Sequence, residues 1–99
     1  MQIAWGQIHW SPRAIRDLRH VRAYVAPENP VAARAIADAI EVHVERLAAY
    51  PRLGHLQTGG FRELVEPRYR YVVRYDLLSD DATVTRVHIL SLWHPKQAR

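Results

Sequence analysis

The chain of 99 residues is long enough for one hydrophobic core and too short for two, so we expect a single domain over residues 1–99. It has no cysteine, which excludes disulfide and thiolate chemistry and fits a reducing, cytoplasmic setting. The net charge of +4 favours an acidic partner, either a nucleic acid or an acidic protein segment. No apolar run approaches the ~20 residues that cross a bilayer, so no membrane is expected as a partner.

The N-terminal part predicts a short strand and then a helix. Residues 1–6 are expected to be an N-terminal extension, and Gln7–Trp10 a strand. Ser11 followed by Pro12 marks a helix start, because the serine oxygen can accept an orphan backbone N–H and proline has no N–H to leave unpaired. The helix is expected to extend to about Ala26. Its apolar residues form one stripe, and its arginines lie mostly off that stripe, so its outer surface is basic: Arg13, Arg16, Arg19 and Arg22.

A short connector leads to a second predicted helix. Pro27 ends the first helix, and Asn29–Pro30 repeats the combination of a capping residue and proline. Apolar residues at helical spacing continue to about Tyr50. Because the connector is short, the two helices are expected to form an antiparallel hairpin.

The second half of the chain predicts strands. Pro51–Gly60 is expected to be a loop and Phe61–Val65 a strand. From Tyr69 onward the residues alternate strictly, which is typical of a strand with one aromatic and one partly cationic face. The aromatic face carries Tyr69, Tyr71, Val73, Tyr75 and Leu77, and the other face carries Arg70, Val72, Arg74, Asp76 and Leu78.

The last predicted strand extends from Thr83 to about Trp93, after a polar turn, and residues 94–99 form a basic tail. Strict alternation puts Val87 and Ile89 on one face of this strand and Leu90 and Leu92 on the other. The order strand, two helices, three strands favours an α+β fold: an N-terminal short strand and an antiparallel helical hairpin packed on a small, mostly antiparallel sheet.

The motifs in this order resemble the ParE/RelE superfamily of toxins from bacterial type II toxin–antitoxin systems. The resemblance covers Gln7 to about Gln97 and implies the same fold, a small cytoplasmic toxin without a cofactor, and a cognate antitoxin that neutralises it. Both a homodimer and a toxin–antitoxin hetero-oligomer remain open. The matching pieces are Trp10-Ser11-Pro12, Tyr24-Val25-Ala26, Asn29-Pro30 with Ala32-Ala33, Gly60-Phe61-Arg62-Glu63-Leu64-Val65, Tyr71-Val72-Val73-Arg74-Tyr75, and Val87-His88-Ile89-Leu90 with Trp93-His94.

Within the superfamily, the resemblance implies two different activities. ParE-like toxins poison DNA gyrase, whereas RelE-like toxins cut mRNA in the ribosome. The pieces Tyr24-Val25-Ala26 and Arg62-Glu63-Leu64-Val65 look more like the ParE branch, although His94-Pro95-Lys96-Gln97 departs from that branch's usual His-Gly-x-Arg ending. The ParE-like activity is therefore the leading hypothesis. The alternatives are a RelE-like endoribonuclease and a degenerate member that binds its antitoxin without being toxic.

Each hypothesis assigns roles to the same basic residues. A metal-free ribonuclease needs a proton donor, a proton acceptor and cations for the phosphorane, which Arg62, Arg74, His94 and Lys96 could supply, with His88 as a further proton carrier. A binding toxin would instead contact its target through a wider set. The six histidines lack metal-ligand spacing, so no metal site is predicted. The residues expected to bind the target are Arg62, Arg70, Arg74, Trp93, His94 and Lys96.

Overall fold

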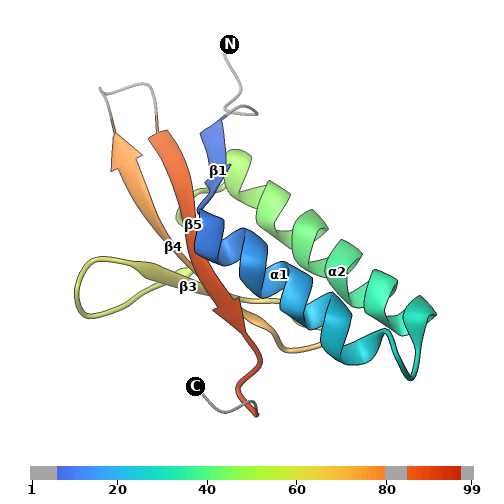
Figure 1. Cartoon of the computed structure of the whole chain (residues 1–99). Helices are drawn as coiled ribbons and strands as arrows, with labels where there is room; N and C mark the ends of the chain where they lie inside the picture. Colours follow the sequence, from blue (N-terminus) through green and yellow to red (C-terminus); the bar gives the residue numbers. More distant parts are fainter. Residues whose placement is uncertain (1–6, 80–84, 97–99) are drawn as a thin grey trace.

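The computed structural model describes residues 7–79 and 85–96, which form two helices on one face of a five-stranded sheet (Figure 1). The strands lie in the order β1-β5-β4-β3-β2 across the sheet. The predicted α+β fold, with a helical hairpin on a mostly antiparallel sheet, is therefore confirmed. The predicted extension (1–6), the polar turn around 80–82, the start of the last strand and the end of the tail (97–99) lie outside the described residues.

Helix α1 (Pro12–Val25) follows β1 (Ile8–Trp10) and begins where the sequence predicts. The Ser11 hydroxyl accepts a hydrogen bond from the Ala14 N–H at 3.0 Å, and Pro12 occupies the first turn. The same hydroxyl donates to the Leu90 carbonyl at 3.0 Å. One side chain therefore caps the helix and fastens it to the last strand.

Helix α2 (Pro30–Glu45) is capped by Asn29, whose side chain accepts a hydrogen bond from the Ala32 N–H at 3.0 Å. The prediction that this helix continues to Tyr50 is wrong, because its end tightens into one 3₁₀ turn, η2 (Arg46–Ala48). The tighter turn keeps Leu47 and Ala48 in the core. None of the helices in the described part of the chain is long and apolar enough to cross a membrane.

The sheet combines one parallel and three antiparallel pairings. β1 pairs parallel with β5 (Thr85–Trp93), which pairs antiparallel with β4 (Val72–Ser79). β4 in turn pairs with β3 (Arg62–Val65), and β3 with β2 (His55–Leu56). The sequence missed β2, because two residues are too few to show an alternating pattern.

The N-terminal turn of α1 covers the edge of β5 that β1 leaves open. The register of β1 ends opposite Ile89, and the Ser11 N–H donates to the Ile89 carbonyl at 3.0 Å. Further along, the Asp17 carboxylate accepts a hydrogen bond from the Leu92 N–H at 3.1 Å. The Ser11 backbone and the Asp17 side chain thus replace a neighbouring strand and protect this part of the edge from pairing with other chains.

The strand predicted from Tyr69 begins only at Val72, because the residues between β3 and β4 form a turn around Glu66. The Glu66 carboxylate is buried and accepts hydrogen bonds from the backbone N–H groups of Arg68 (3.0 Å) and Tyr69 (2.6 Å). Arg70 has a φ of 69°, in the left-handed region. Arg70 therefore lies in a turn and not on the cationic face of the strand, which corrects the prediction.

A bulge in β5 overturns the predicted faces of the last strand. Arg74 lies opposite Ser91 and Tyr75 opposite Ile89, so Leu90 has no counterpart on β4. One extra residue moves every later side chain to the other face. Leu92 consequently joins Val87 and Ile89 in the core, instead of sharing a face with Leu90. Strict alternation could not reveal this shift.

The core fills the space between the two helices and the face of the sheet that they cover. Its largest fully buried side chains are aliphatic or aromatic, and burial of each contributes about 1.5–3 kcal/mol of transfer free energy. Tyr71, Val73 and Tyr75, from the aromatic face of the predicted strand, are buried in this core. The fully buried residues of largest volume are Tyr75, Ile40, Leu47, Ile89, Val44, Val73 and Val87.

Candidate functional site

The helices cover one face of the sheet and leave the other face without a covering helix (Figure 1). Strand register and the alternation of side chains determine which residues lie on this face. We call this surface the open face. It carries His9 from β1, Glu63 and Val65 from β3, Val72, Arg74, Asp76 and Leu78 from β4, and Arg86, His88, Ser91 and Trp93 from β5.

Arg74 is the centre of a cluster on the open face. Its guanidinium carbon lies 4.2 Å from the centroid of the Phe61 ring and 5.0 Å from that of the Trp93 ring. Its Nε and Nη2 atoms donate to Glu63 Oε2 at 3.2 and 2.8 Å. The arginine and the carboxylate are both partly exposed, at 30% and 24%. The result is a fixed planar cation between two aromatic rings, accessible to a partner.

Arg62 lies on the other side of the sheet from Arg74. Arg62 is opposite Tyr75 in the β3–β4 register, whereas its neighbour Glu63 is opposite Arg74. Because neighbouring residues of a strand point to opposite faces, the two arginine side chains lie on different faces of the sheet. Arg62 Nη1 donates to the Gly54 carbonyl at 2.8 Å and more weakly to the Arg52 carbonyl at 3.4 Å. The sequence grouped Arg62 and Arg74, and the structure separates them.

The same loop is anchored by Tyr75. The Tyr75 hydroxyl donates to the Pro51 carbonyl at 2.8 Å and accepts from the Gly54 N–H at 2.8 Å. A Cβ on Gly54 would lie 2.7 Å from the Tyr75 ring, so the loop can approach only at a glycine. Burial raises the pKa of the Tyr75 phenol, and the Gly54 N–H and Arg62 oppose this shift.

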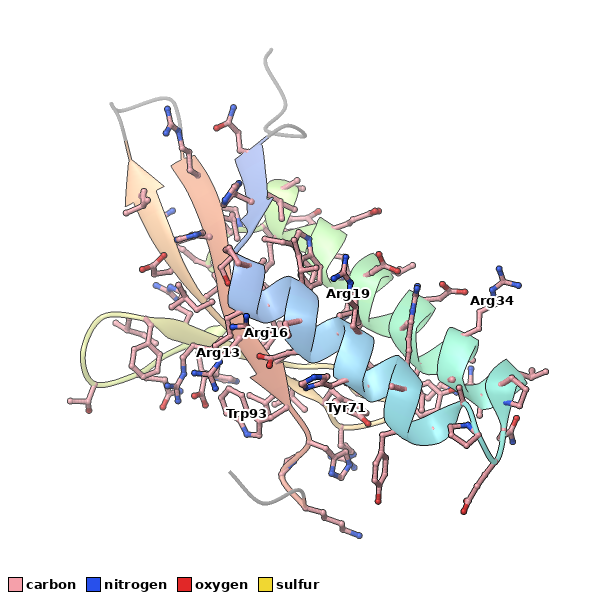
Figure 2. The ribbon with its side chains drawn as sticks, viewed as in Figure 1. Arg13, Arg16, Arg19, Arg34, Tyr71 and Trp93 are labelled. Carbon is pink, nitrogen blue, oxygen red and sulfur yellow. The ribbon has the colours of Figure 1, made fainter. Side chains whose placement is uncertain are left out.

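The C-terminal residues follow Trp93, the last residue of β5. The His94 ring packs edge-on against Tyr71, with centroids 5.0 Å apart, and its Nδ1 accepts the Lys96 backbone N–H at 3.1 Å. In this arrangement the neutral imidazole carries its proton on Nε2. Burial raises the pKa of Tyr71. Tyr71 and Trp93 are both labelled in Figure 2.

Sequence reasoning missed a second feature at the other end of the open face. The His9 and His88 rings lie 5.3 Å apart, and His88 Nδ1 is 3.8 Å from Asp76 Oδ1. This oxygen is buried and has no hydrogen-bond partner among the described residues. The β1–β5 register, which places His9 opposite His88, was the signal that the sequence lacked. A hollow of about 600 Å³ adjoins these residues and is lined by Gln7, His9, Leu78, Arg86, Val87 and His88.

The structure gives each basic candidate residue a different environment. Within residues 7–79 and 85–96, no three His, Asp or Glu side chains gather closely enough to hold a metal ion. Arg74 is paired with Glu63, and Arg62 donates to loop carbonyls. Arg70 is exposed in the turn after β3. Of the six residues predicted to bind the target, Arg74 contacts Trp93 through its side chain, and the Lys96 backbone bonds to the His94 ring.

The fold matches a solved structure described as the chromosomal ParDE TA system from P. aeruginosa, with a TM-score of 0.75 over 89% of this chain and 94% of that chain. The two sequences are 18% identical, so this likeness concerns the fold alone.

Closer relatives define the class of protein. Toxin RelE2 of Caulobacter vibrioides is 35% identical over 83% of this chain and 92% of its own length. Toxin RelE3 of the same organism is 30% identical over 81% of this chain and 89% of its own length. Both relatives are named as toxins, and this chain matches each of them over most of its length.

The sequence model for the ParE toxin of the type II toxin–antitoxin system parDE matches residues 8–99. The chain therefore belongs to the ParE toxin family. This membership confirms the resemblance given by its motifs, and it implies a cognate antitoxin as partner.

Proposed function

We propose that this protein poisons DNA gyrase through the open face of its sheet and is held inactive by its antitoxin in the cytoplasm. The main support is the position of the two arginines that a ribonuclease would use together. Arg62 lies on the helix side and donates to the Gly54 carbonyl, while Arg74 lies on the open face and is paired with Glu63. Such cations suit recognition of a target better than joint stabilisation of one phosphorane.

The proposed target surface centres on Arg74 and Trp93. Their stacked arrangement gives a rigid aromatic and cationic patch, which is typical of residues that dominate the energy of an interface. We include His94 and Lys96, which follow Trp93 in the chain. We also include Arg70, which is exposed between β3 and β4, and Arg62, which holds the loop at Gly54.

The alternative is a RelE-like endoribonuclease that cuts mRNA in the ribosome. Its specific support is the similarity to two relatives that carry the name RelE. In this case Arg74 would contact phosphate, and His94 Nε2 would transfer a proton. Arg62 and Lys96 would have to reach the same phosphate after a rearrangement.

A single expression experiment separates these activities. The toxin is produced without its antitoxin in a bacterial host, and induction of the DNA-damage response and cleavage of mRNA are measured in the same cells. Purified toxin is then tested for inhibition of gyrase supercoiling. DNA damage with intact mRNA supports gyrase poisoning. Cleavage of mRNA within translated codons would instead support the ribonuclease activity. The absence of any growth effect would indicate a degenerate member of the family.

A matched pair of variants tests the role of the open face. Arg74→Lys keeps the charge but removes the planar fork that stacks between Phe61 and Trp93. Arg34→Lys makes the same change on α2, where Arg34 points away from the sheet (Figure 2). We expect weaker inhibition of gyrase by Arg74→Lys alone. Equal inhibition of gyrase by the two folded variants would show that the open face does not take part in gyrase poisoning.

A further inference from the structure

Three neighbouring strands bring a row of three titratable side chains together on the open face. His9 on β1 lies opposite His88 on β5, and His88 lies opposite Asp76 on β4. The three strands are adjacent in the sheet (Figure 1), so the row runs across them. None of the three residues belongs to the proposed target surface, and their role is therefore open.

The two histidine rings are spaced as ligands of one metal ion. Their centroids lie 5.3 Å apart, and the ring planes are tilted by 39°. An ion that binds two histidine nitrogens at about 2.0–2.1 Å in tetrahedral geometry holds the ring centroids about 5 Å apart. The observed separation thus matches a pair of imidazoles that share one ion.

Asp76 supplies the neighbour that a metal-binding histidine requires. His88 Nδ1 lies 3.8 Å from Asp76 Oδ1, a buried oxygen that has no hydrogen-bond partner among the described residues. Metal-binding histidines usually donate the N–H of their second ring nitrogen to a carboxylate or a carbonyl, which fixes the ring and makes the first nitrogen a better ligand. A small shortening of this distance would satisfy the Asp76 oxygen and leave His88 Nε2 as the ligand atom.

The surroundings leave space and access for an ion. A hollow of about 600 Å³ is lined by both histidines, and the His88 and Asp76 side chains are 33% and 36% exposed. Arg86 also lines the hollow, and its positive charge is offset by the negative charge of Asp76. Because no third ligand lies close enough within residues 7–79 and 85–96, water or a small anion would occupy the remaining positions around the ion.

We propose that His9 and His88 bind a divalent transition-metal ion, with Asp76 as the residue that positions His88. Imidazole suits zinc, copper and nickel, and copper generally binds most tightly. The ion joins β1 to β5 across their parallel pairing, so bound metal stabilises the folded protein by mass action. This site is independent of the toxin's target and of its antitoxin.

Calorimetric titration with Zn²⁺ and with Cu²⁺ tests the site in the full-length toxin, purified without a histidine tag. The titration is done at about pH 7.5, because histidine binds metal as neutral imidazole. We expect one ion per chain. Loss of the carboxylate behind a ligating histidine costs about 10- to 100-fold in metal affinity, so His9→Gln and His88→Gln, which each remove a ligand, should cost at least about 100-fold. His20→Gln and His55→Gln alter exposed histidines on α1 and β2 and should leave the affinity unchanged.

Electron paramagnetic resonance of the Cu²⁺-loaded protein counts the nitrogen ligands. We expect two imidazole nitrogens in the wild-type protein and one in His9→Gln and in His88→Gln. Asp76→Asn should keep the spectrum of two nitrogens while it weakens affinity by at least about tenfold. A merely structural role of Asp76 would not produce this combination, and circular dichroism confirms that each variant is folded.

Thermal melting provides a further readout that does not involve the spectrum. Excess Zn²⁺ should raise the melting temperature of the wild-type toxin but not that of His88→Gln, and EDTA should reverse the rise. The proposal is overturned if both ions fail to bind the folded toxin, if they bind His9→Gln and His88→Gln as tightly as the wild type, or if saturating Zn²⁺ leaves the melting temperature unchanged. These measurements require no toxicity, so their failure is distinguishable from failure of the gyrase proposal.

Discussion

At the scale of single residues, several polar side chains hold the fold by reaching distant backbone groups. The Tyr75 hydroxyl bonds to the loop at Pro51 and Gly54, and the Glu66 carboxylate gathers two N–H groups of its turn. Buried groups of this kind stabilise a protein chiefly because leaving a partner unpaired is costly. The loop and the turn therefore depend on one side chain each.

Removal of the Tyr75 hydroxyl tests this dependence. Tyr75→Phe leaves the buried Gly54 N–H and the Pro51 carbonyl without their partner, so we expect a loss of about 1–3 kcal/mol in the free energy of unfolding. Urea denaturation followed by circular dichroism measures the loss. Tyr24→Phe is the matched control, because Tyr24 is 76% exposed. A loss below the experimental error for Tyr75→Phe would contradict the anchoring role.

Variants of Arg62 and His94 distinguish a toxin that binds gyrase from one that cleaves mRNA. A general acid or base contributes about 100- to 10,000-fold in rate, so a ribonuclease should lose its toxicity with His94→Ala. Under the gyrase proposal, we expect His94→Ala to remain toxic at high expression. Arg62→Ala should weaken toxicity more, because the loop loses its hydrogen bond to the guanidinium at the Gly54 carbonyl. Growth inhibition is compared at equal protein levels, and complete loss of toxicity in folded His94→Ala would favour the ribonuclease.

At the scale of elements, the sequence predicts what local signals control. The capping residues Ser11 and Asn29, each followed by proline, locate both helix starts correctly. The bulge at Leu90 and the turn at Glu66 escaped prediction, because both depend on partners that are distant or outside the alternating pattern. The candidate site was predicted in part for the same reason: its residue types are visible, but contact between Arg74 and Trp93 requires the strand register.

The turn between β3 and β4 provides a test of backbone strain. Arg70 adopts a φ of 69°, which glycine accepts freely and β-branched residues resist. Arg70→Gly should therefore keep or slightly raise the stability, whereas Arg70→Val should lower the free energy of unfolding by about 1–2 kcal/mol. Thermal melting of the two variants shows their order. Equal melting temperatures would mean that the turn relaxes when Arg70 is replaced.

At the scale of the whole molecule, stability should depend on pH through His43 on α2. Burial, and then the charge of Arg46, lower the pKa of His43 below its usual 6.5, although Glu66 and a backbone hydrogen bond at Val65 oppose the shift. Below pH 6.5 the unfolded chain takes up the proton before the folded protein does. The free energy of unfolding must therefore fall as pH drops from 6.5 toward the folded pKa.

The measurement compares urea denaturation at about pH 7.5 and about pH 5.5. His43→Gln should reduce the loss of stability on acidification, because glutamine does not titrate. His55→Gln changes an exposed histidine in β2 and serves as the control. An unchanged pH dependence in His43→Gln would assign the effect to other groups.

The bulge in β5 has a consequence for how such toxins diverge. Leu90 has no counterpart on β4, so deletion of this one residue would preserve every pairing on both sides of it. Deletion at His88 would instead put the strand out of phase and turn Val87 or Ile89 away from the helices. The position of the single unpaired residue thus marks where length can vary without loss of the fold. If the strand kept its full length but lost the bulge, Trp93 would point toward the helices. The open face would then carry different side chains without any substitution.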